Sequence, residues 1–305
     1  MPWRRDATVV SADHAGPGPT ATLTAVGADA IGLVLARPAR MLGLEPFFME
    51  LIGGIEETLS SDERSLLLHL VPDHDAEIAA YRRWGHGGLV DAVVVVNLVV
   101  DDPRLPVLRG LGIPTVVVGG PDRSVPDVAH VWMDNDRTMR EAVGYLVDLG
   151  HDTIGRVSGP AALAHTRVRT RAFLSECTSR GARGVVVEGD YSETSGTRAA
   201  RTLLGRNDPP SALVFDNDVM ALAALGVAHE LGLTVPRDVS ILAWDDSPLC
   251  RLSHPSLTAM SLDVHAMGVQ VGDAVLNLLA SGRPTISTAP LPRLVARGST
   301  ARRAS

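Results

Sequence analysis

Cysteine is scarce in this chain of 305 residues. Its two cysteines, Cys177 and Cys250, are far apart, and no CxxC pair or Cys/His cluster has the spacing of a zinc site. Nothing therefore requires an oxidising compartment. We expect two free thiols that behave as small hydrophobic residues, and no metal site.

Long hydrophobic runs are also lacking. The longest, residues 89–100, contains Asp91 and Asn97 and is too short to cross a bilayer. Polar residues follow the basic residues near the N-terminus, where a secretory signal would have an apolar core. The sequence therefore predicts a soluble, cytoplasmic protein with no membrane partner.

Basic residues are outnumbered, with 28 Lys and Arg against 35 Asp and Glu and a net charge of -7. A surface that binds DNA phosphates is usually basic, so this composition argues against DNA binding by the body of the chain.

Enzyme signatures are missing as well, since the chain has no GxGxxG, GxxxxGK[ST], HExxH or GxSxG motif. Asp245 and Asp246 could be read as an acid and a base, but adjacent side chains project differently and no nucleophile accompanies them. We expect no catalytic residue and no cofactor.

Apolar β-branched runs and segments of helical period alternate from Ala30 onward. Continuous apolar strands separated by helices are typical of parallel sheets covered on both faces. The number of predicted strands and helices is too large for one compact sheet of typical width. Two doubly wound α/β subdomains therefore fit best, and a single eight-fold barrel is the alternative. Strands are predicted at 31–35, 66–70, 92–96, 115–118, 153–157, 185–187, 211–215 and 239–243, and helices at 48–59, 75–84, 138–149, 167–179, 193–204 and 219–231. Residues 1–28 are predicted to be a tail or linker.

Polar and aromatic side chains follow several of these strands. Ligands of open α/β sheets bind beyond the carboxyl ends of the strands. The residues at these ends are Tyr191, Asn217, Trp244 and Asp245, with Arg169 in a following helix. Carboxylate, amide and guanidinium groups bond vicinal hydroxyls while an aromatic ring covers C–H groups, which predicts a sugar or polyol site.

Three neighbouring residues also have structural explanations. Asp218 can cap the helix that follows it. Phe48 can be a core residue, and Trp244 can pack beneath its own loop.

Seven segments in order resemble the LacI/GalR family of transcription regulators, over about residues 31–300. They are 148–155 (DLGHDTIG), 157–160 (VSGP) with Arg169 nine residues on, 188–192 (EGDYS) with Ser195 and Gly196, 217–221 (NDVMA), 231–240 (LGLTVPRDVS), 254–258 (HPSLT) and 294–300 (LVARGST).

The resemblance implies a periplasmic-binding-protein-like fold of type I, with two subdomains joined by three crossovers near 133–135, 262–264 and 287–290. It divides the chain into an N-terminal subdomain (29–133 and 263–287), a C-terminal subdomain (134–262 and 288–300) and a tail (301–305). Arg169, Tyr191, Asn217 and Asp245 would line the cleft from the C-terminal side and Phe47 from the other, with Asp134 at the first crossover.

The resemblance also implies a homodimer that binds DNA through a helix-turn-helix head. About 28 residues stand where the family has such a head, without its amphipathic period, so DNA binding is expected only through a head not evident in this chain. The family often has an acidic residue where this chain has Gly119 and Gly120.

Two functions fit this pattern. The first is the ligand-sensing part of a regulator, in which a small effector changes the subdomain arrangement and thereby DNA binding. The alternative is a solute-binding protein for a sugar or other metabolite.

Overall fold

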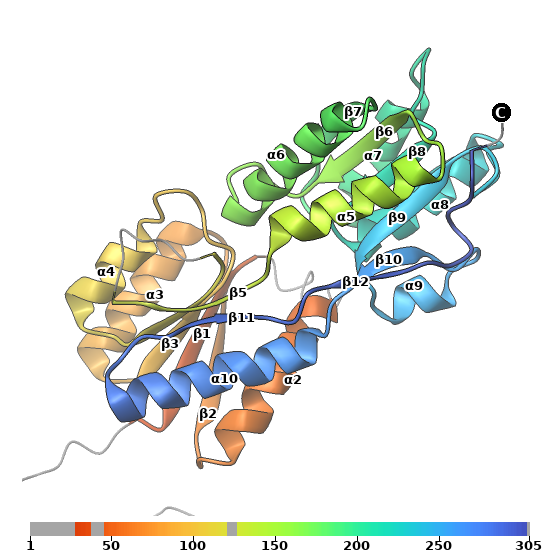
Figure 1. The fold of residues 1–305 in the computed structure, drawn as a ribbon. Coiled ribbons are helices and arrows are strands. Elements are labelled where there is room, and N and C mark those ends of the chain that lie inside the picture. Colours follow the sequence, from red (N-terminus) through yellow and green to blue (C-terminus); the bar gives the residue numbers. More distant parts are fainter. Residues whose placement is uncertain (1–27, 38–45, 121–126, 304–305) are drawn as a thin grey trace, which may run out of the picture.

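A computed structural model of the protein describes residues 28–37, 46–120 and 127–303. Figure 1 shows two subdomains, and each is built on one six-stranded sheet. This confirms the predicted α/β fold with two doubly wound subdomains, and it excludes the single barrel because neither sheet closes on itself. The expected N-terminal tail lies outside the described residues except for residue 28, and the C-terminal tail is described only to residue 303.

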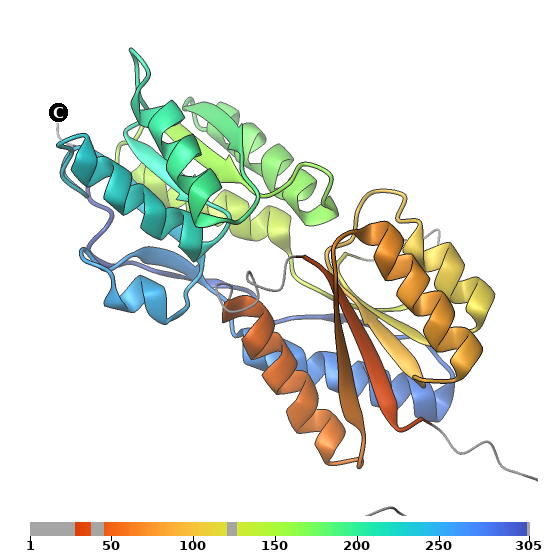
Figure 2. The ribbon, with the colours of Figure 1, turned by 180° about the vertical axis from the view of Figure 1, so that it is seen from behind.

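The sheet of the N-terminal subdomain has the order β11-β5-β4-β3-β1-β2, and all its neighbouring strands are parallel. Its strands are β1 (Ala30–Ala36), β2 (Ser65–Val71), β3 (Ala92–Val95), β4 (Thr115–Val118), β5 (Ala129–Trp132) and β11 (Ile286–Thr288). Helices α2 (Pro46–Ser60) and α10 (Val264–Ser281) bury their apolar residues on one face. Helices α3 (His74–Gly87) and α4 (Arg104–Leu111) cover the other, which Figure 2 brings to the front in orange and yellow.

The sheet of the C-terminal subdomain has the order β12-β10-β9-β8-β6-β7. Its strands are β6 (Thr153–Ser158), β7 (Arg183–Glu188), β8 (Ala212–Phe215), β9 (Ser240–Asp245), β10 (Thr258–Ser261) and β12 (Arg293–Val295), of which β12 is antiparallel. Helices α5 (Asn135–Asp148) and α6 (Ala164–Ser179) pack on one face. Helices α7 (Glu193–Leu204), α8 (Asp218–Glu230) and α9 (Pro248–Leu252) pack on the other. No helix in the described ranges has the length and apolar character to cross a membrane.

The chain passes between the two sheets three times. It does so at residues 133–134, between β5 and α5, at 262–263, between β10 and α10, and at 289–292, between β11 and β12. All three connections run through the middle of the molecule in Figure 1. The carboxyl ends of both sheets therefore meet at the same place, where a ligand site of an open α/β sheet forms.

Side-chain caps fix where three helices begin at this edge. Asp134 accepts a hydrogen bond from the Arg137 amide at the start of α5, at 3.0 Å. Ser192 and Asn217 cap α7 and α8 in the same way. The cap of α8 is therefore Asn217, and the alternative reading of Asp218 as that cap is wrong because Asp218 is already the first helical residue.

Helices α2 and α10 approach so closely that glycine is required at their contact. A Cβ atom on Gly268 would lie 2.4 Å from the carbonyl oxygen of Leu51 and 3.0 Å from the Cα atom of Gly54. A Cβ atom on Gly54 would lie 2.1 Å from the carbonyl oxygen of His265. Because α10 returns from the other subdomain, this contact fixes where the second crossover enters the N-terminal core.

We expect Gly268→Ala to lower the free energy of unfolding by about 1–3 kcal/mol, because the backbones of α2 and α10 must separate to admit the methyl group. Urea unfolding measures the change. Gly226→Ala is the matched control, because Gly226 is exposed on α8 and an added Cβ meets no atom within 4 Å. The control should be unchanged or up to about 1 kcal/mol more stable. Equal stability of the two variants would contradict the proposed packing constraint.

Candidate functional site

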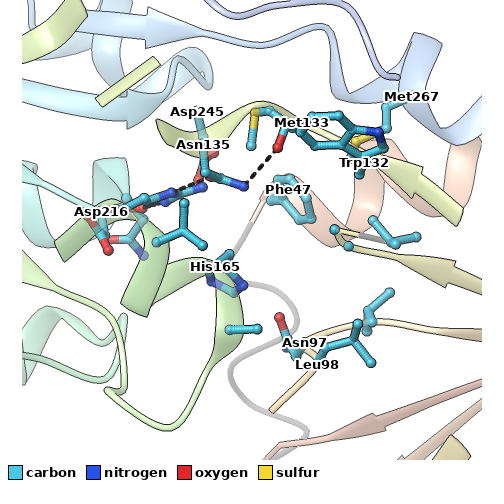
Figure 3. Close-up of a pocket in the computed structure, with 18 of the residues that line it drawn as sticks. Phe47, Asn97, Leu98, Trp132, Met133, Asn135, His165, Asp216, Asp245 and Met267 are labelled. Carbon is cyan, nitrogen blue, oxygen red and sulfur yellow. Dashed lines mark hydrogen bonds between the residues drawn. The ribbon is translucent and has the colours of Figure 1, made fainter. Parts of the chain in front are cut away.

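A cavity of about 560 Å³ lies between the two subdomains, beyond the carboxyl ends of both sheets. Its volume is typical of sites for small organic ligands. Six of the seven residues predicted from the sequence line it, and Figure 3 shows part of this lining. The six are Phe47, Asp134, Arg169, Tyr191, Asn217 and Asp245.

Trp244 is the exception, and the prediction that it contacts a ligand directly is corrected. It lies inside β9 with its side chain in the core against α5 and α6, and its exposed fraction is 0%. The alternative reading, in which Trp244 packs beneath its own loop, agrees with its burial in the structure. Its ring supports Arg169, whose guanidinium carbon lies 4.1 Å from the ring centroid.

Arg169 projects from α6 and is held on three sides. Besides the ring of Trp244, its Nε donates to Oδ1 of Asn135 at 2.6 Å and its Nη1 to the carbonyl oxygen of Asp216 at 3.5 Å. No hydrogen bond within the described residues uses Nη2. A guanidinium fixed in this way can donate to a ligand without first being ordered.

Asn135 connects this arginine to the first crossover. Its Nδ2 donates to the carbonyl oxygen of Met133 at 3.2 Å, and its Oδ1 accepts from Arg169. The carboxylate of Asp134, which was predicted as a ligand contact, lines the cavity and also caps α5. Movement at the crossover is therefore linked to the position of the Arg169 side chain.

Behind Arg169 lies a buried ion pair. Arg156 on β6 donates through Nε and Nη2 to the two carboxylate oxygens of Asp216, at 2.9 and 2.6 Å, and both side chains have an exposed fraction of 0%. The Gly159 amide donates to the same carboxylate at 3.1 Å. Burial acts to raise the pKa of Asp216, but Arg156 and Arg169 outweigh it and lower the pKa below its ordinary value. Asp216 therefore stays ionised beneath the site.

The side chain of Asn217 is hydrogen-bonded to the main chain of Tyr191. Oδ1 of Asn217 accepts from the Met220 amide at 3.0 Å, and its Nδ2 donates to the carbonyl oxygen of Tyr191 at 2.9 Å. Tyr191 has a φ of 70°, a left-handed conformation that is uncommon outside glycine. The second hydrogen on Nδ2 of Asn217 is the group that this pair can still offer a ligand.

His165 is a cavity residue that the sequence reasoning missed. Its Nε2 lies 2.8 Å from the hydroxyl of Tyr191, and the two rings stack. Burial, together with Arg169, lowers the pKa of His165 to about 3, so the imidazole is neutral. The available signal was its spacing, four residues before Arg169, which places both side chains on one face of α6.

Asp245 is the carboxylate at the end of β9, where φ is 84°. Its side chain makes no hydrogen bond within the described residues, although it lines the cavity. Burial and the nearby carboxylate of Asp218 raise the pKa of Asp245 to about 7, with Arg169 opposing. Asp218 itself accepts from the Ser247 amide at 3.2 Å.

The wall from the N-terminal subdomain is mainly apolar. Phe47 meets Phe48 edge to face, with ring centroids 5.3 Å apart. Phe48 is only 4% exposed, so the reading as a core residue is correct even though it borders the cavity. The Arg37 guanidinium lies over the Phe48 ring at 4.2 Å, and burial lowers the pKa of Arg37 to about 10. Further lining residues that the sequence reasoning missed are Leu98, Trp132, Met133 and Met267.

The subdomains also meet through their main chains, outside the three crossovers. Val99, in the loop after β3, forms an isolated antiparallel bridge with Leu163, just before α6. The amide of Ala164 donates to the carbonyl oxygen of Leu98 at 2.8 Å. We call these two contacts the closing contact, because they join the two walls of the cavity.

A buried network holds the loop of the closing contact. Arg104 bonds both carboxylate oxygens of Asp102 and one of Glu77, at 2.6 to 2.9 Å, and its Nη2 donates to the carbonyl oxygen of Asn97. Asp102 also accepts from the Val99 amide at 3.0 Å. The loop therefore reaches the other subdomain in a defined conformation.

Among the residues that the structure describes, no cluster of His, Cys, Asp and Glu could hold a metal ion. Cys177 and Cys250 are both free and buried.

Comparison with known proteins places this chain in a family. The periplasmic binding protein-like domain matches residues 143–300. The HTH-type transcriptional regulator CelR of Thermobifida fusca is 31% identical over 254 residues, which cover 81% of this chain and 74% of CelR. The solved structure of a LacI family transcriptional regulator from Bifidobacterium animalis subsp. lactis has a TM-score of 0.82 at 32% identity, covering 92% of this chain and 100% of that one. The complex of CelR with cellobiose has a TM-score of 0.81 at 27% identity, covering 89% and 84%.

The raised pKa of Asp245 predicts a pH-dependent contribution to stability. The folded protein binds a proton at Asp245 up to about pH 7, whereas the unfolded chain releases it near pH 4. Between these values the folded state binds more protons, so this residue makes stability fall as pH rises. Relative to the wild type, Asp245→Asn should gain on the order of 3 kcal/mol as pH rises from 4 to 7.

Urea unfolding of both proteins at several pH values measures this gain. His165 has the opposite sign in part of the window, since its lowered pKa reduces stability as pH falls, so only the difference between the two proteins isolates Asp245. Asp273→Asn, at an exposed position on α10, is the control and should run parallel to the wild type. A difference for Asp245→Asn that does not change with pH would contradict the shifted pKa.

Proposed function

This chain belongs to the LacI family of transcriptional regulators, and we propose that the cavity of its ligand-sensing domain binds a sugar that controls DNA binding. The relatives are transcriptional regulators and not enzymes, which confirms the prediction that the chain is not an enzyme. It also disfavours the alternative of a stand-alone solute-binding protein.

The observation that carries the sugar proposal is the placement of Arg169 and Asp245 on one wall of the cavity, each with hydrogen-bonding capacity that the described residues leave unused. A fixed donor beside a free acceptor suits adjacent hydroxyl groups, which both donate and accept. Phe47 faces this pair from the other subdomain and can cover the C–H side of a sugar ring. The structural neighbour CelR, which was solved with cellobiose, supports the same class of ligand.

We propose that the effector acts by stabilising the closed arrangement of the two subdomains. A ligand that touches both walls adds to the closing contact at Val99, Leu163 and Ala164. A ligand shifts such an equilibrium only through its different affinity for the two arrangements, and contact with both walls provides that difference. The crossover at Asn135 moves with Arg169 and carries the change between subdomains.

We further propose a homodimer that contacts DNA through a helix-turn-helix head of the kind that the relatives' names state. The net charge of -7 does not favour phosphate binding by the body of the chain. Exposed apolar side chains on both subdomains support a dimer through both, among them Met49 and Leu67 on one and Leu222 and Leu252 on the other. Such a regulator acts in the cytoplasm.

The first experiment is thermal unfolding with a panel of sugars, polyols and nucleobases. A ligand at 100 times its Kd adds about 2.7 kcal/mol to stability, which corresponds to a shift of several degrees in Tm. We expect a shift with at least one monosaccharide or disaccharide. A shift with a nucleobase and with no sugar would contradict the proposed effector class.

The same sugar then tests the site through two arginines of α6. Arg169→Ala should weaken its affinity about 10- to 100-fold, because a hydrogen bond from a charged donor contributes about 1.5–3 kcal/mol. Arg167→Ala, which removes an exposed arginine two residues away, should bind like the wild type. Isothermal titration gives both values, and equal affinities would disprove the assignment of Arg169.

A proline at position 164 tests the closing contact. Ala164 is the first residue of α6, where proline is tolerated, and Leu163 has a φ of -72° and a ψ of 132°, which suit a residue before proline. Ala164→Pro removes the amide that donates to Leu98 and should weaken sugar binding about two- to tenfold. Ala164→Gly keeps the amide and serves as the control. If both variants bind equally, the closing contact does not contribute to effector binding.

A further inference from the structure

The two walls of the cavity differ in chemistry. The C-terminal subdomain contributes the charged and amide groups, among them Arg169, Asn217 and Asp245. The N-terminal subdomain contributes six side chains that we call the apolar wall: Phe47, Leu98, Val118, Trp132, Met133 and Met267. In Figure 3, Asp216 and Asp245 lie on one side of the space, and Trp132, Met267 and Leu98 lie on the other.

The apolar wall is continuous with the core of its subdomain. Phe47, Val118 and Met133 pack against the cluster that contains Met267, so the wall is an edge of that core. At the end of β4, Gly119 and Gly120 add no side chain to the cavity.

Polar side chains border the apolar wall at three places among the described residues. Arg37 lies over the ring of Phe48, Asn97 and Asp101 belong to the loop after β3, and Asp134 and Asp136 follow Met133 at the first crossover. Asp101 is exposed. The side chains of Trp132, Phe47 and Met267 themselves offer mainly apolar surface, which suits a ligand group without hydroxyls.

The cavity is larger than one sugar ring requires, since its volume of about 560 Å³ is typical of sites for drug-sized ligands. A second sugar unit would place hydroxyls against the apolar wall. Each hydroxyl that loses water without a new partner lowers affinity by about tenfold or more. The ring nitrogens and exocyclic groups of a nucleobase would also lose water at the apolar wall without gaining a hydrogen-bond partner.

We propose that the effector is a glycoside with an apolar aglycone, an inference that rests on the proposed function. Its sugar hydroxyls bond Arg169 and Asp245, and its hydrocarbon group, aromatic or branched aliphatic, packs on Trp132, Phe47 and Met133. Only a ligand with both parts satisfies both walls, and it thereby bridges the two subdomains that the closing contact joins.

Matched pairs of glycosides test this inference. The probes are the methyl and phenyl glycosides of glucose, galactose and mannose in both anomeric forms, with cellobiose and adenosine for comparison, each titrated by calorimetry against the whole chain. For the sugar that binds, the phenyl glycoside should bind about 10- to 100-fold more tightly than the methyl glycoside, because it buries an additional ring.

Two variants locate the effect. Trp132→Ala should reduce the preference for the phenyl glycoside at least about fivefold, whereas Leu231→Ala, at an exposed position at the end of α8, should keep the wild-type preference. Gly120→Asp is a second test that does not remove core volume, since an added Cβ there meets no atom within 4 Å. Its carboxylate should weaken phenyl glycoside binding and strengthen cellobiose binding.

The outcomes separate the two proposals. Equal or weaker binding of the phenyl glycoside, or tighter binding of cellobiose or adenosine than of any phenyl glycoside, overturns the apolar aglycone. In the case of cellobiose, the sugar-sensing function still stands. If none of the sugar ligands binds, both proposals are overturned together.

Discussion

The polar half of the cavity depends on the buried ion pair between Arg156 and Asp216. Burying two charges away from water costs free energy unless both groups have their full set of hydrogen bonds. Here two hydrogen bonds join the guanidinium to the carboxylate, and the Gly159 amide donates a third to the carboxylate. The pair joins β6 to the residue that follows β8, and it places the carbonyl oxygen of Asp216 where Arg169 donates to it. With Trp244 on its other side, Arg169 needs no rearrangement to meet a ligand. Preorganisation of this kind reduces the entropy lost on binding.

Apolar packing, and not an ion pair, forms the other half of the cavity. The wall from the N-terminal subdomain is an edge of an apolar core, so it offers shape and contact area more than hydrogen bonds. Within the described residues, three crossovers and the closing contact at Val99 and Leu163 join the two halves. A ligand that satisfies both halves therefore also determines how the subdomains are arranged, which is the property that a sensor domain of a transcriptional regulator needs.

Local signals explain how much of the fold could be predicted. The strand over 115–118 and the helix over 193–204 have the predicted bounds, because one is a continuous apolar run and the other begins with a capping serine. The helix α4 was not predicted, since it is short and contains Pro106. Short strands β5, β10, β11 and β12 were also missed, because they lack the continuous β-branched run of the equally short β4 and their pairing comes from distant segments.

The sequence by itself determined which polar groups stand at the carboxyl ends of the strands, because that order is local: Tyr191, Asn217 and Asp245 each follow or end an apolar run. The tertiary structure decided how they are used. It turned Trp244 into the core as a support for Arg169, since alternate side chains of a strand face opposite sides. It also brought together residues from separate segments, namely Leu98, Trp132, His165 and Met267, into one cavity. No sequence pattern encodes which wall faces which, because that depends on how the three crossovers set one sheet against the other.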